Sequence, residues 1–559
     1  MTQPWWKKAV VYQIYPKSFN DTTGNGVGDI QGIIEKLDYL HKLGVDVLWL
    51  TPIYKSPQKD NGYDISDYFN IHEEYGTMAD FDELLEKAHQ RNIKIVMDIV
   101  VNHTSTEHEW FVESRKSQDN KYRDYYIWKD GETEQPPTNW ESKFGGNAWQ
   151  LDEETGQYYL HLFDVTQADL NWENELVRKD LYDMMKYWLD KGIDGFRLDV
   201  INLISKDQSF PNDDKGDGRR FYTDGPRIHD YLHEMNNEVF SNYDMMTVGE
   251  MSSTTIENCI LYTQPDRKEL NMTFNFHHLK VDYPGGDKWT VAPFNFHELK
   301  EILSSWQEGM QKGNGWMALF WCNHDQPRVV SRFGNDTEYH KESAKMLATT
   351  IHMMRGTPYI YQGEEFGMTN PKYESIDQYR DVESLNMYEI LQEKGKSEQE
   401  VLDILKSKSR DNSRTPMQWD ATENAGFTSG TPWIPVSNNF KDVNAEVAMQ
   451  NEDSVFYHYQ KLIQLRKTYD IITDGDFKLI EKDHDDVFAY VRLKDNEALL
   501  VINNFYGNKT SFVLPQELDF SGYESEILLS NYSDSPSDYA NMTLRPYESV
   551  VYRLSKLAK

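Results

Sequence analysis

Short apolar runs alternate with amphipathic stretches along most of the chain. Eight of these runs are short enough to be buried strands. They are VVYQIYP (10–16), VDVLWLTP (45–52), KIVMDIVVN (94–102), GFRLDV (195–200), MMTVGE (245–250), TFNF (273–276), ALFWCNHD (318–325) and PYIYQGEE (358–365). Stretches such as 33–43 and 78–90 between them have helical periodicity. This alternation predicts an α/β fold, a (β/α)8 TIM barrel. A flat doubly wound sheet is the structural alternative, but its GxGxxG motif is missing.

Two segments depart from this alternation of strands and helices and so divide the chain into parts. The stretch from Asn102 to near Lys191 is too long for one helix and is rich in Trp, Tyr and Gly, which indicates an inserted subdomain after the third strand. Beyond Met417 a helical segment at 456–467 precedes five short strand-like pieces, which is typical of a β-sandwich. We therefore predict a barrel formed by residues 1–103 and 173–477. An inserted subdomain is expected at 104–172, and a C-terminal antiparallel β-sandwich at 478–559.

Composition narrows the classes of partner. The chain has 559 residues and a formal net charge of −34, which opposes binding to nucleic acid or to anionic membranes. It has no apolar run of about 18 residues that would span a membrane, and its start lacks the apolar core of a signal peptide. Two cysteines exclude a disulfide framework. We expect a cytoplasmic monomer whose partner is a small molecule.

The run GFRLDV places charges inside an otherwise buried strand. Arg197 and Asp199 are two residues apart, so they share one face of a strand. A structural ion pair is one interpretation. The other interpretation is that these charges belong to a functional site, because several further runs also end in polar residues. These residues are Asp98 with His103, Glu250, and His324 with Asp325.

Barrel enzymes carry their chemistry at the carboxyl ends of the strands. Each of these side chains alone has an alternative interpretation as a solvated loop charge. Three carboxylates at one rim suit glycosyl transfer with retention, in which one carboxylate attacks the anomeric carbon and a second acts as acid and then base. Metal-dependent hydrolysis is the competing chemistry, but no HxxEH or HxH cluster accompanies the acids.

The motifs resemble those of the α-amylase superfamily of retaining α-glycosidases, glycoside hydrolase family 13. Five short regions occur in the family's order, which are DIVVNH (98–103), GFRLDV (195–200), TVGE (247–250), FWCNHD (320–325) and GTPYIYQGEEFG (356–367). QADLN (167–171) is similar to the QPDLN of the oligo-1,6-glucosidase branch, with Ala168 in place of proline, and RDNSRTPMQWD (410–420) also belongs to that branch. The resemblance covers essentially the whole chain.

The resemblance implies a role for each matching residue. Asp199 is expected to be the nucleophile, held ionised by Arg197, and Glu250 the general acid/base. Asp325 is expected to stabilise the transition state beside His324. The remaining residues of the glucosyl subsite are expected to be Asp60, Tyr63, His103, Phe163 and Arg414.

Asp60 and Arg414 are expected to pair and close this subsite, which implies exo-acting hydrolysis. From the residues alone, Tyr63 could equally be a buried aromatic. No cofactor is expected to be required.

A polar loop, DTTGNGVGD (21–29), lies where relatives in this family carry a calcium site. The expected ligands are Asp21, Thr23, Asn25, Val27 through its backbone, and Asp29. Thr and Asn replace two charged ligands of the family pattern, so binding should be weaker. A plain polar turn is the alternative.

Within the branch, several stretches are similar to those of enzymes that hydrolyse α,α-trehalose 6-phosphate to glucose and glucose 6-phosphate. They are residues 5–29, DVINLISKDQ (199–208), GEMSSTT (249–255) and FNFHHLKVDYPGGDKW (274–289). A phosphorylated sugar in so acidic a chain needs local cations. Lys280, Lys288 and Arg328 are the expected phosphate ligands, although the two lysines could simply be solvated.

Other functions stay open at this point. An oligo-1,6-glucosidase acting on isomaltose and related ends would share the same barrel, and Val200 after the nucleophile fits that group too. An isomerase or transglycosylase would use the same covalent intermediate with a sugar acceptor. A non-catalytic barrel scaffold would not need Asp199, Glu250 and Asp325 together.

Overall fold

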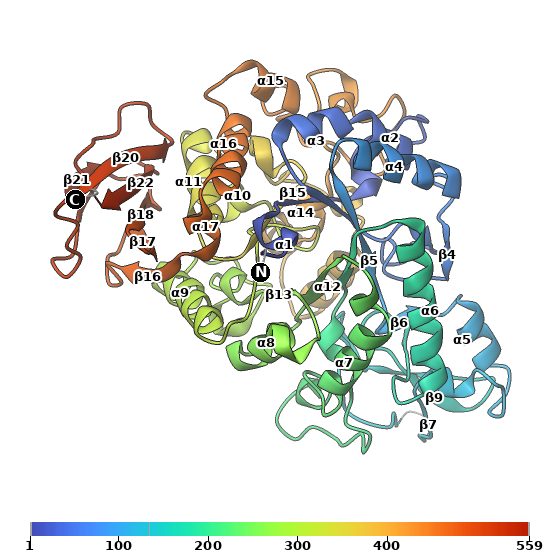
Figure 1. Ribbon diagram of the computed structural model, residues 1–559. Helices are drawn as coiled ribbons and strands as arrows, with labels where there is room; N and C mark the ends of the chain where they lie inside the picture. The colour runs from blue at the N-terminus through green and yellow to red at the C-terminus, as the bar shows by residue number, and fades with distance from the viewer. Residues whose placement is uncertain (1–2, 133–134, 557–559) are drawn as a thin grey trace.

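A computed structural model describes residues 3–132 and 135–556 of the chain. Eight parallel strands form the barrel at its centre (Figure 1). They are β1 (Val11–Ile14), β2 (Val47–Leu50), β5 (Lys94–Ile99), β11 (Gly195–Leu198), β12 (Met246–Glu250), β13 (Met272–Phe274), β14 (Ala318–Leu319) and β15 (Thr357–Tyr361). A parallel bridge between Thr273 and Met317 joins the two ends of this sheet, so the barrel is nearly closed. The predicted (β/α)8 fold is confirmed.

Helices surround the barrel and connect its strands. They are α2 (Ile30–Glu35), α3 (Leu37–Leu43), α4 (Met78–Gln90), α6 (Glu175–Lys191), α7 (Ile228–Glu238), α8 (Ile256–Thr263), α9 (Phe296–Lys312), α10 (Val329–Phe333), α11 (His340–His352), α16 (Val455–Thr468) and α17 (Asp470–Asp474), with α1 (Trp5–Lys8) before the first strand. Local sequence defines their ends. Thr77 and Asp80 form a capping box at the start of α4, and Gly192 ends α6 with a left-handed φ of 110°.

Strand β11 is held close to β12 by a glycine. A Cβ on Gly195 would lie 2.0 Å from the carbonyl oxygen of Met246, so only glycine fits there. In the parallel register Arg197 lies beside Asp98 of β5. The guanidinium therefore enters the barrel next to a carboxylate of the neighbouring strand.

The excursion after β5 forms the predicted subdomain B, at the lower right of Figure 1. Its neck is the antiparallel pair β6 (His103–Ser105) and β10 (Gln167–Asp169). Beyond the neck lie α5 (Glu109–Ser114) and a three-stranded antiparallel sheet of β7 (Trp128–Lys129), β9 (Gln157–Leu160) and β8 (Trp149–Asp152). Trp140 and Trp149 are buried in a small core that also contains Val200, Leu203 and Tyr222 from the segment after β11. This shared core holds the excursion against the barrel rim.

The C-terminal strands form an antiparallel domain on the opposite side of the molecule (red in Figure 1). A five-stranded sheet contains β16 (Asp476–Ile480), β17 (Val487–Lys494), β18 (Glu497–Asn504), β22 (Ser549–Lys556) and β20 (Tyr523–Ser530), and a two-stranded sheet contains β19 (Thr510–Val513) and β21 (Asn541–Leu544). Residues of β17 alternate between two cores, because Phe488 and Tyr490 pack with the barrel while Val487 and Ala489 pack with the small sheet. The predicted β-sandwich is thus present, and β16 begins slightly before residue 478.

A segment between β15 and α16 adds four helices that the sequence pattern did not predict. They are α12 (Val382–Glu393), α13 (Glu398–Lys408), α14 (Asp411–Arg414) and α15 (Ala445–Gln450). The pair α12 and α13 has a small core that includes Val401 and Leu405. This segment carries Arg410 to the barrel rim, at the N-terminal end of α14.

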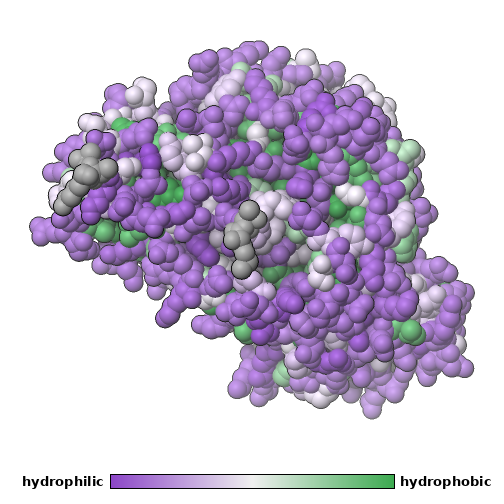
Figure 2. Space-filling view, in the orientation of Figure 1, coloured by the Kyte–Doolittle hydropathy of each residue, from purple (hydrophilic) through white to green (hydrophobic). Residues whose placement is uncertain are grey.

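Hydrophilic residues cover most of the face shown in Figure 2, and hydrophobic ones are scattered among them. No helix within the described residues combines the length and the apolar character needed to cross a membrane.

Candidate active site

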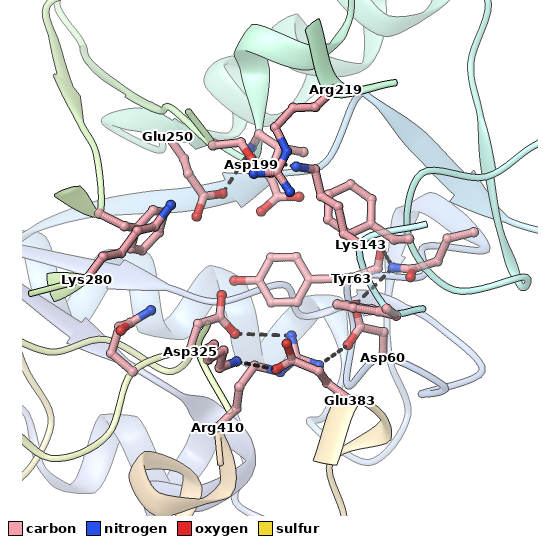
Figure 3. A pocket seen from close by; sticks show the side chains of 18 of the residues that line it. Asp60, Tyr63, Lys143, Asp199, Arg219, Glu250, Lys280, Asp325, Glu383 and Arg410 are labelled. Carbon is pink, nitrogen blue, oxygen red and sulfur yellow. Dashed lines mark hydrogen bonds and ion pairs between the residues drawn. The ribbon is translucent and has the colours of Figure 1, made fainter. Parts of the chain in front are cut away.

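A cavity of about 410 Å³ lies at the carboxyl ends of the barrel strands, below subdomain B (Figure 3). Its lining combines carboxylates, basic groups and aromatic rings. These residues are Asp60, Tyr63, His103, Lys143, Phe144, Phe163, Gln167, Asp199, Val200, Arg219, Glu250, Ser252, Phe276, Lys280, Tyr283, Gly286, Lys288, Trp289, Asp325, Gln326, Glu383 and Arg410. A cavity of this size accommodates a small ligand.

Arg197 joins three carboxylates at the floor of the cavity. Its Nη1 lies 2.9 Å from Asp98 Oδ1 and 2.5 Å from Asp199 Oδ1, and its Nη2 lies 2.8 Å from Glu250 Oε2. The Arg197 side chain is fully buried. One guanidinium therefore holds the carboxyl group of Asp199, directly after β11, next to that of Glu250, the last residue of β12.

The two carboxyl groups differ in acidity. Burial raises the pKa of Glu250 to about 8, and the nearby Asp199 and Asp325 contribute while Arg197 opposes the shift. Burial raises the pKa of Asp199 to about 6, with Arg197 again opposing. Near neutral pH this pair can hold one protonated group, at Glu250, and one ionised group, at Asp199. These are the states expected of a general acid and a nucleophile.

Asp325 is kept ionised by two arginines. Burial alone would raise its pKa, but Arg410 and Arg414 hold the pKa of Asp325 well below its usual range. Burial lowers the pKa of His324 to about 3, so the imidazole is neutral and the arginines supply the charge. Arg414 Nη2 lies 2.8 Å from Asp325 Oδ1, and Arg410 Nη1 lies 3.3 Å from the same oxygen.

The predicted pair of Asp60 with Arg414 is wrong. Asp60 Oδ1 pairs instead with Arg410 Nη2, at 3.1 Å, while Arg414 is directed to Asp325 and to the backbone of His324. The two arginines are four residues apart at the ends of α14, so both reach the same acidic cluster, which includes Asp381. Arg410 lies farther out and closes the cavity, and Arg414 is buried behind it.

Aromatic and imidazole rings line the cavity between these carboxylates. Tyr63 stacks on His324 with ring centroids 5.1 Å apart, and its hydroxyl donates to Asp98 Oδ2 at 2.9 Å. His103 lies against Phe163, with ring centroids 5.2 Å apart. Burial lowers the pKa of His103 to about 4. The rings of Tyr63, His103 and Phe163 therefore form an uncharged part of the cavity wall, and their role in binding a glucosyl unit stays a prediction.

The three predicted phosphate ligands have different environments. Lys280 lines the cavity and is exposed. Lys288 also lines it, but its Nζ lies 2.6 Å from Glu383 Oε2. The prediction for Arg328 is wrong, because its side chain is buried and donates to the carbonyl oxygens of Gln362 and Ser413. Pro327 and Arg328 lie at the start of α10, where the chain turns the guanidinium into the core.

Sequence reasoning assigned no role to Asp98, Arg410, Lys143 or Arg219. Asp98 stood at a strand end and Arg410 opened the motif RDNSRTP, so signals for both were present. Lys143 lies in a loop and Arg219 at the start of a short helix, and neither belongs to a motif. Only the folding of subdomain B and of the loop after β11 brings them to the cavity.

In the loop predicted to bind calcium, the carboxylates already accept hydrogen bonds from nearby groups of the chain. Asp21 accepts from the backbone N–H groups of Thr23, Gly24 and Gly26, and Asp29 caps α2 by accepting from Gly32 N. The carboxylate oxygens that a calcium ion requires are therefore engaged with donors. A calcium ion at this loop stays a prediction.

A nearly closed α/β barrel with two carboxyl groups of different acidity paired at its rim is the arrangement found in glycoside hydrolases. The sequence profile of the alpha amylase catalytic domain matches residues 13–475, and that of the alpha-amylase SusG C-terminal domain matches residues 487–551. The chain therefore belongs to the α-amylase family.

Individual relatives are similar over the whole chain. The trehalose-6-phosphate hydrolase of Bacillus subtilis (strain 168) is 69% identical over 554 residues, 99% of each chain. The oligo-1,6-glucosidase of Bacillus cereus is 56% identical over 560 residues, which cover 99% of this chain and 100% of that one. The crystal structure of Bacillus licheniformis trehalose-6-phosphate hydrolase has a TM-score of 0.96 at 68% identity and covers 99% of this chain and 100% of the other.

Proposed function

We propose that this glycoside hydrolase cleaves α,α-trehalose 6-phosphate to glucose and glucose 6-phosphate, with retention at the anomeric carbon. Two features of the cavity together carry the proposal. One end, the glucosyl subsite, is closed, and the other end, where the leaving group would lie, has a lysine that no carboxylate within the described residues neutralises. Arg410 and Asp60 close one end of the cavity. Lys280 lies at the other end, beside Glu250, well away from Asp60 (Figure 3). The 69% identity to a trehalose-6-phosphate hydrolase supports the same substrate.

The chemistry follows from the two carboxyl groups. Asp199 attacks the anomeric carbon while Glu250 donates its proton to the glycosidic oxygen, so glucose 6-phosphate leaves and a glucosyl ester forms on Asp199. The Glu250 carboxylate then takes a proton from water, which attacks the same carbon and releases glucose. Asp325 stays ionised throughout and binds hydroxyl groups of the sugar. The sugar ring gains positive charge in the transition state, which the ionised carboxylate stabilises.

Rates of glucose release from trehalose 6-phosphate, trehalose and isomaltose test the substrate. We expect kcat/KM to be highest for trehalose 6-phosphate by at least about 10-fold, the effect of one charge-assisted hydrogen bond. Lys280→Ala should reduce kcat/KM for the phosphorylated sugar far more than for trehalose. Equal losses on both sugars would remove Lys280 from the phosphate site.

Hydrolysis of isomaltose and isomalto-oligosaccharides is the second candidate function. The 56% identity to an oligo-1,6-glucosidase favours it, because the barrel, the carboxylates and the closed subsite serve both reactions. A preference for isomaltose in the same assay would establish it. A cytoplasmic location and a monomeric state remain predictions.

A further inference from the structure

Five basic side chains line the cavity, and carboxylates neutralise only some of them. Arg410 pairs with Asp60 and Asp381, and Lys288 pairs with Glu383. Within residues 3–132 and 135–556, neither Lys143 nor Lys280 forms a salt bridge. Among the residues that the structure describes, Arg219 forms a salt bridge with the nearby Asp217 alone, and its side chain remains 49% exposed. The cavity thus has an excess of positive charge in a chain whose net charge is −34.

Lys143 belongs to subdomain B but is held at the catalytic rim. Its Nζ donates to Ser252 Oγ at 3.0 Å, two residues after Glu250, and lies 5.5 Å from the ring centroid of Tyr222. Burial together with the neighbouring Arg219 and Lys280 lowers the pKa of Lys143 to about 7. A half-buried ammonium without a carboxylate is unfavourable unless a ligand supplies the negative charge.

Three segments that are distant in the sequence bring these cations together. Lys143 comes from subdomain B, Arg219 from the short helix Arg219–Phe221 after β11, and Lys280 from the loop after β13. In Figure 3 Arg219 and Lys280 lie on the side of Asp199 and Glu250, away from the Arg410 and Asp60 pair. An anion among these cations would therefore belong to the leaving group and not to the bound glucosyl unit.

We propose that Lys143 and Arg219 are specificity-determining residues that bind the 6-phosphate of the leaving sugar together with Lys280. This inference rests on the proposed function. A phosphate dianion has three acceptor oxygens for charge-assisted hydrogen bonds. Lys143 has donors beyond the one given to Ser252, and Arg219 has donors beyond those given to Asp217. Residues of three separate loops would then close around the phosphate.

The test is a set of variants assayed on trehalose 6-phosphate and on trehalose. Lys143→Met and Arg219→Gln should each lower kcat/KM for trehalose 6-phosphate by about 10- to 100-fold, mainly through KM. Losses on trehalose should be only a few-fold. Lys143→Arg, which keeps the charge, should recover part of the loss. Lys121→Met is the matched control, because Lys121 is an exposed lysine of the same subdomain and does not line the cavity.

A second measurement separates this inference from the proposed function. Inhibition of p-nitrophenyl α-glucoside hydrolysis by glucose 6-phosphate, compared with glucose, reports phosphate binding without trehalose 6-phosphate turnover. Lys143→Met should raise the Ki for glucose 6-phosphate by about 10-fold or more and leave the Ki for glucose nearly unchanged. If the wild-type enzyme prefers trehalose 6-phosphate but the variants lose kcat/KM equally on both sugars, the inference about Lys143 and Arg219 fails and the proposed function stands. If wild type shows no such preference, the proposed function fails.

Discussion

The backbone N–H of Val200 donates a hydrogen bond to Glu250 Oε2, at 3.0 Å. Val200 follows Asp199, the proposed nucleophile, and has a φ of 37° and a ψ of 40°, a left-handed conformation that a β-branched residue rarely adopts. This turn directs the N–H group across to strand β12. Together with Arg197 it fixes the position of the Glu250 carboxyl group relative to Asp199. Backbone strain of this kind is stored where the surrounding structure holds it in place.

The pH dependence of kcat/KM should be bell-shaped. Asp199, with its pKa raised to about 6, must be ionised to attack, so activity is lost as the pH falls through that value. Glu250, with its pKa raised to about 8, must be protonated to donate, so activity is lost as the pH rises through it. Rates on trehalose 6-phosphate from pH 4 to pH 10 measure both limbs. A flat profile above pH 8 would contradict the assignment of Glu250 as the acid.

Replacement of Glu250 should affect substrates according to their leaving group. Glu250→Gln removes the proton donor and should lower kcat on a disaccharide by about 10²–10⁴-fold. The rate of the first step on p-nitrophenyl α-glucoside should fall much less, because p-nitrophenolate is a good leaving group that needs little protonation. Burst kinetics on that substrate separate formation of the glucosyl ester from its hydrolysis. Equal losses of the first step on both substrates would show that Glu250 has another role.

Removal of Arg197 should lower both stability and activity. Arg197→Gln leaves buried carboxylates without their cation, and loss of one partner from a buried ion pair costs about 3–5 kcal/mol of unfolding free energy. Denaturant unfolding measures this change. Arg91→Gln is the control, because Arg91 pairs with the exposed Asp38 and its loss should change the free energy of unfolding far less. Similar effects of both substitutions would argue against the bridging role of Arg197.

Arg410 should matter more for catalysis than the sequence motif suggested. Arg410→Gln removes the partner of Asp60 and one of the two arginines at Asp325. We expect kcat/KM to fall by about 10²–10³-fold on phosphorylated and neutral sugars alike, the size typical of breaking a buried hydrogen-bonded charge pair. Arg328→Gln should instead lower the thermal midpoint, and its kcat/KM on folded protein should show no selective loss for phosphorylated sugar.

Calcium binding at residues 21–29 can be measured by thermal unfolding with and without the ion. With a millimolar dissociation constant, as weakly charged sites have, 10 mM calcium should stabilise the protein by about 1.4 kcal/mol. Asp21→Asn should remove this gain. An identical midpoint in calcium and in chelator would show that the hydrogen bonds of Asp21 and Asp29 alone hold the loop.

Local patterns along the chain are enough to predict the barrel and the position of three acids at its rim. Apolar runs with helical spacers define parallel strands, and in a closed parallel sheet all carboxyl ends lie on one rim. For that reason Asp199, Glu250 and Asp325 could be placed together before any coordinates, and they do share one cavity. These features depend on local periodicity and on the order of the motifs, which a linear sequence contains.

Which basic groups face the cavity depends on how the folded segments pack against one another. Arg410 and Arg414 stand in one motif, but packing of α14 against the rim directs Arg410 to Asp60 and buries Arg414. Arg328 follows the motif NHDQP and is nevertheless turned into the core, while Lys143 comes to the rim on a separate subdomain. The direction of these long side chains depends on contacts with segments from 34 to 350 residues away in the chain, and no local pattern encodes those contacts.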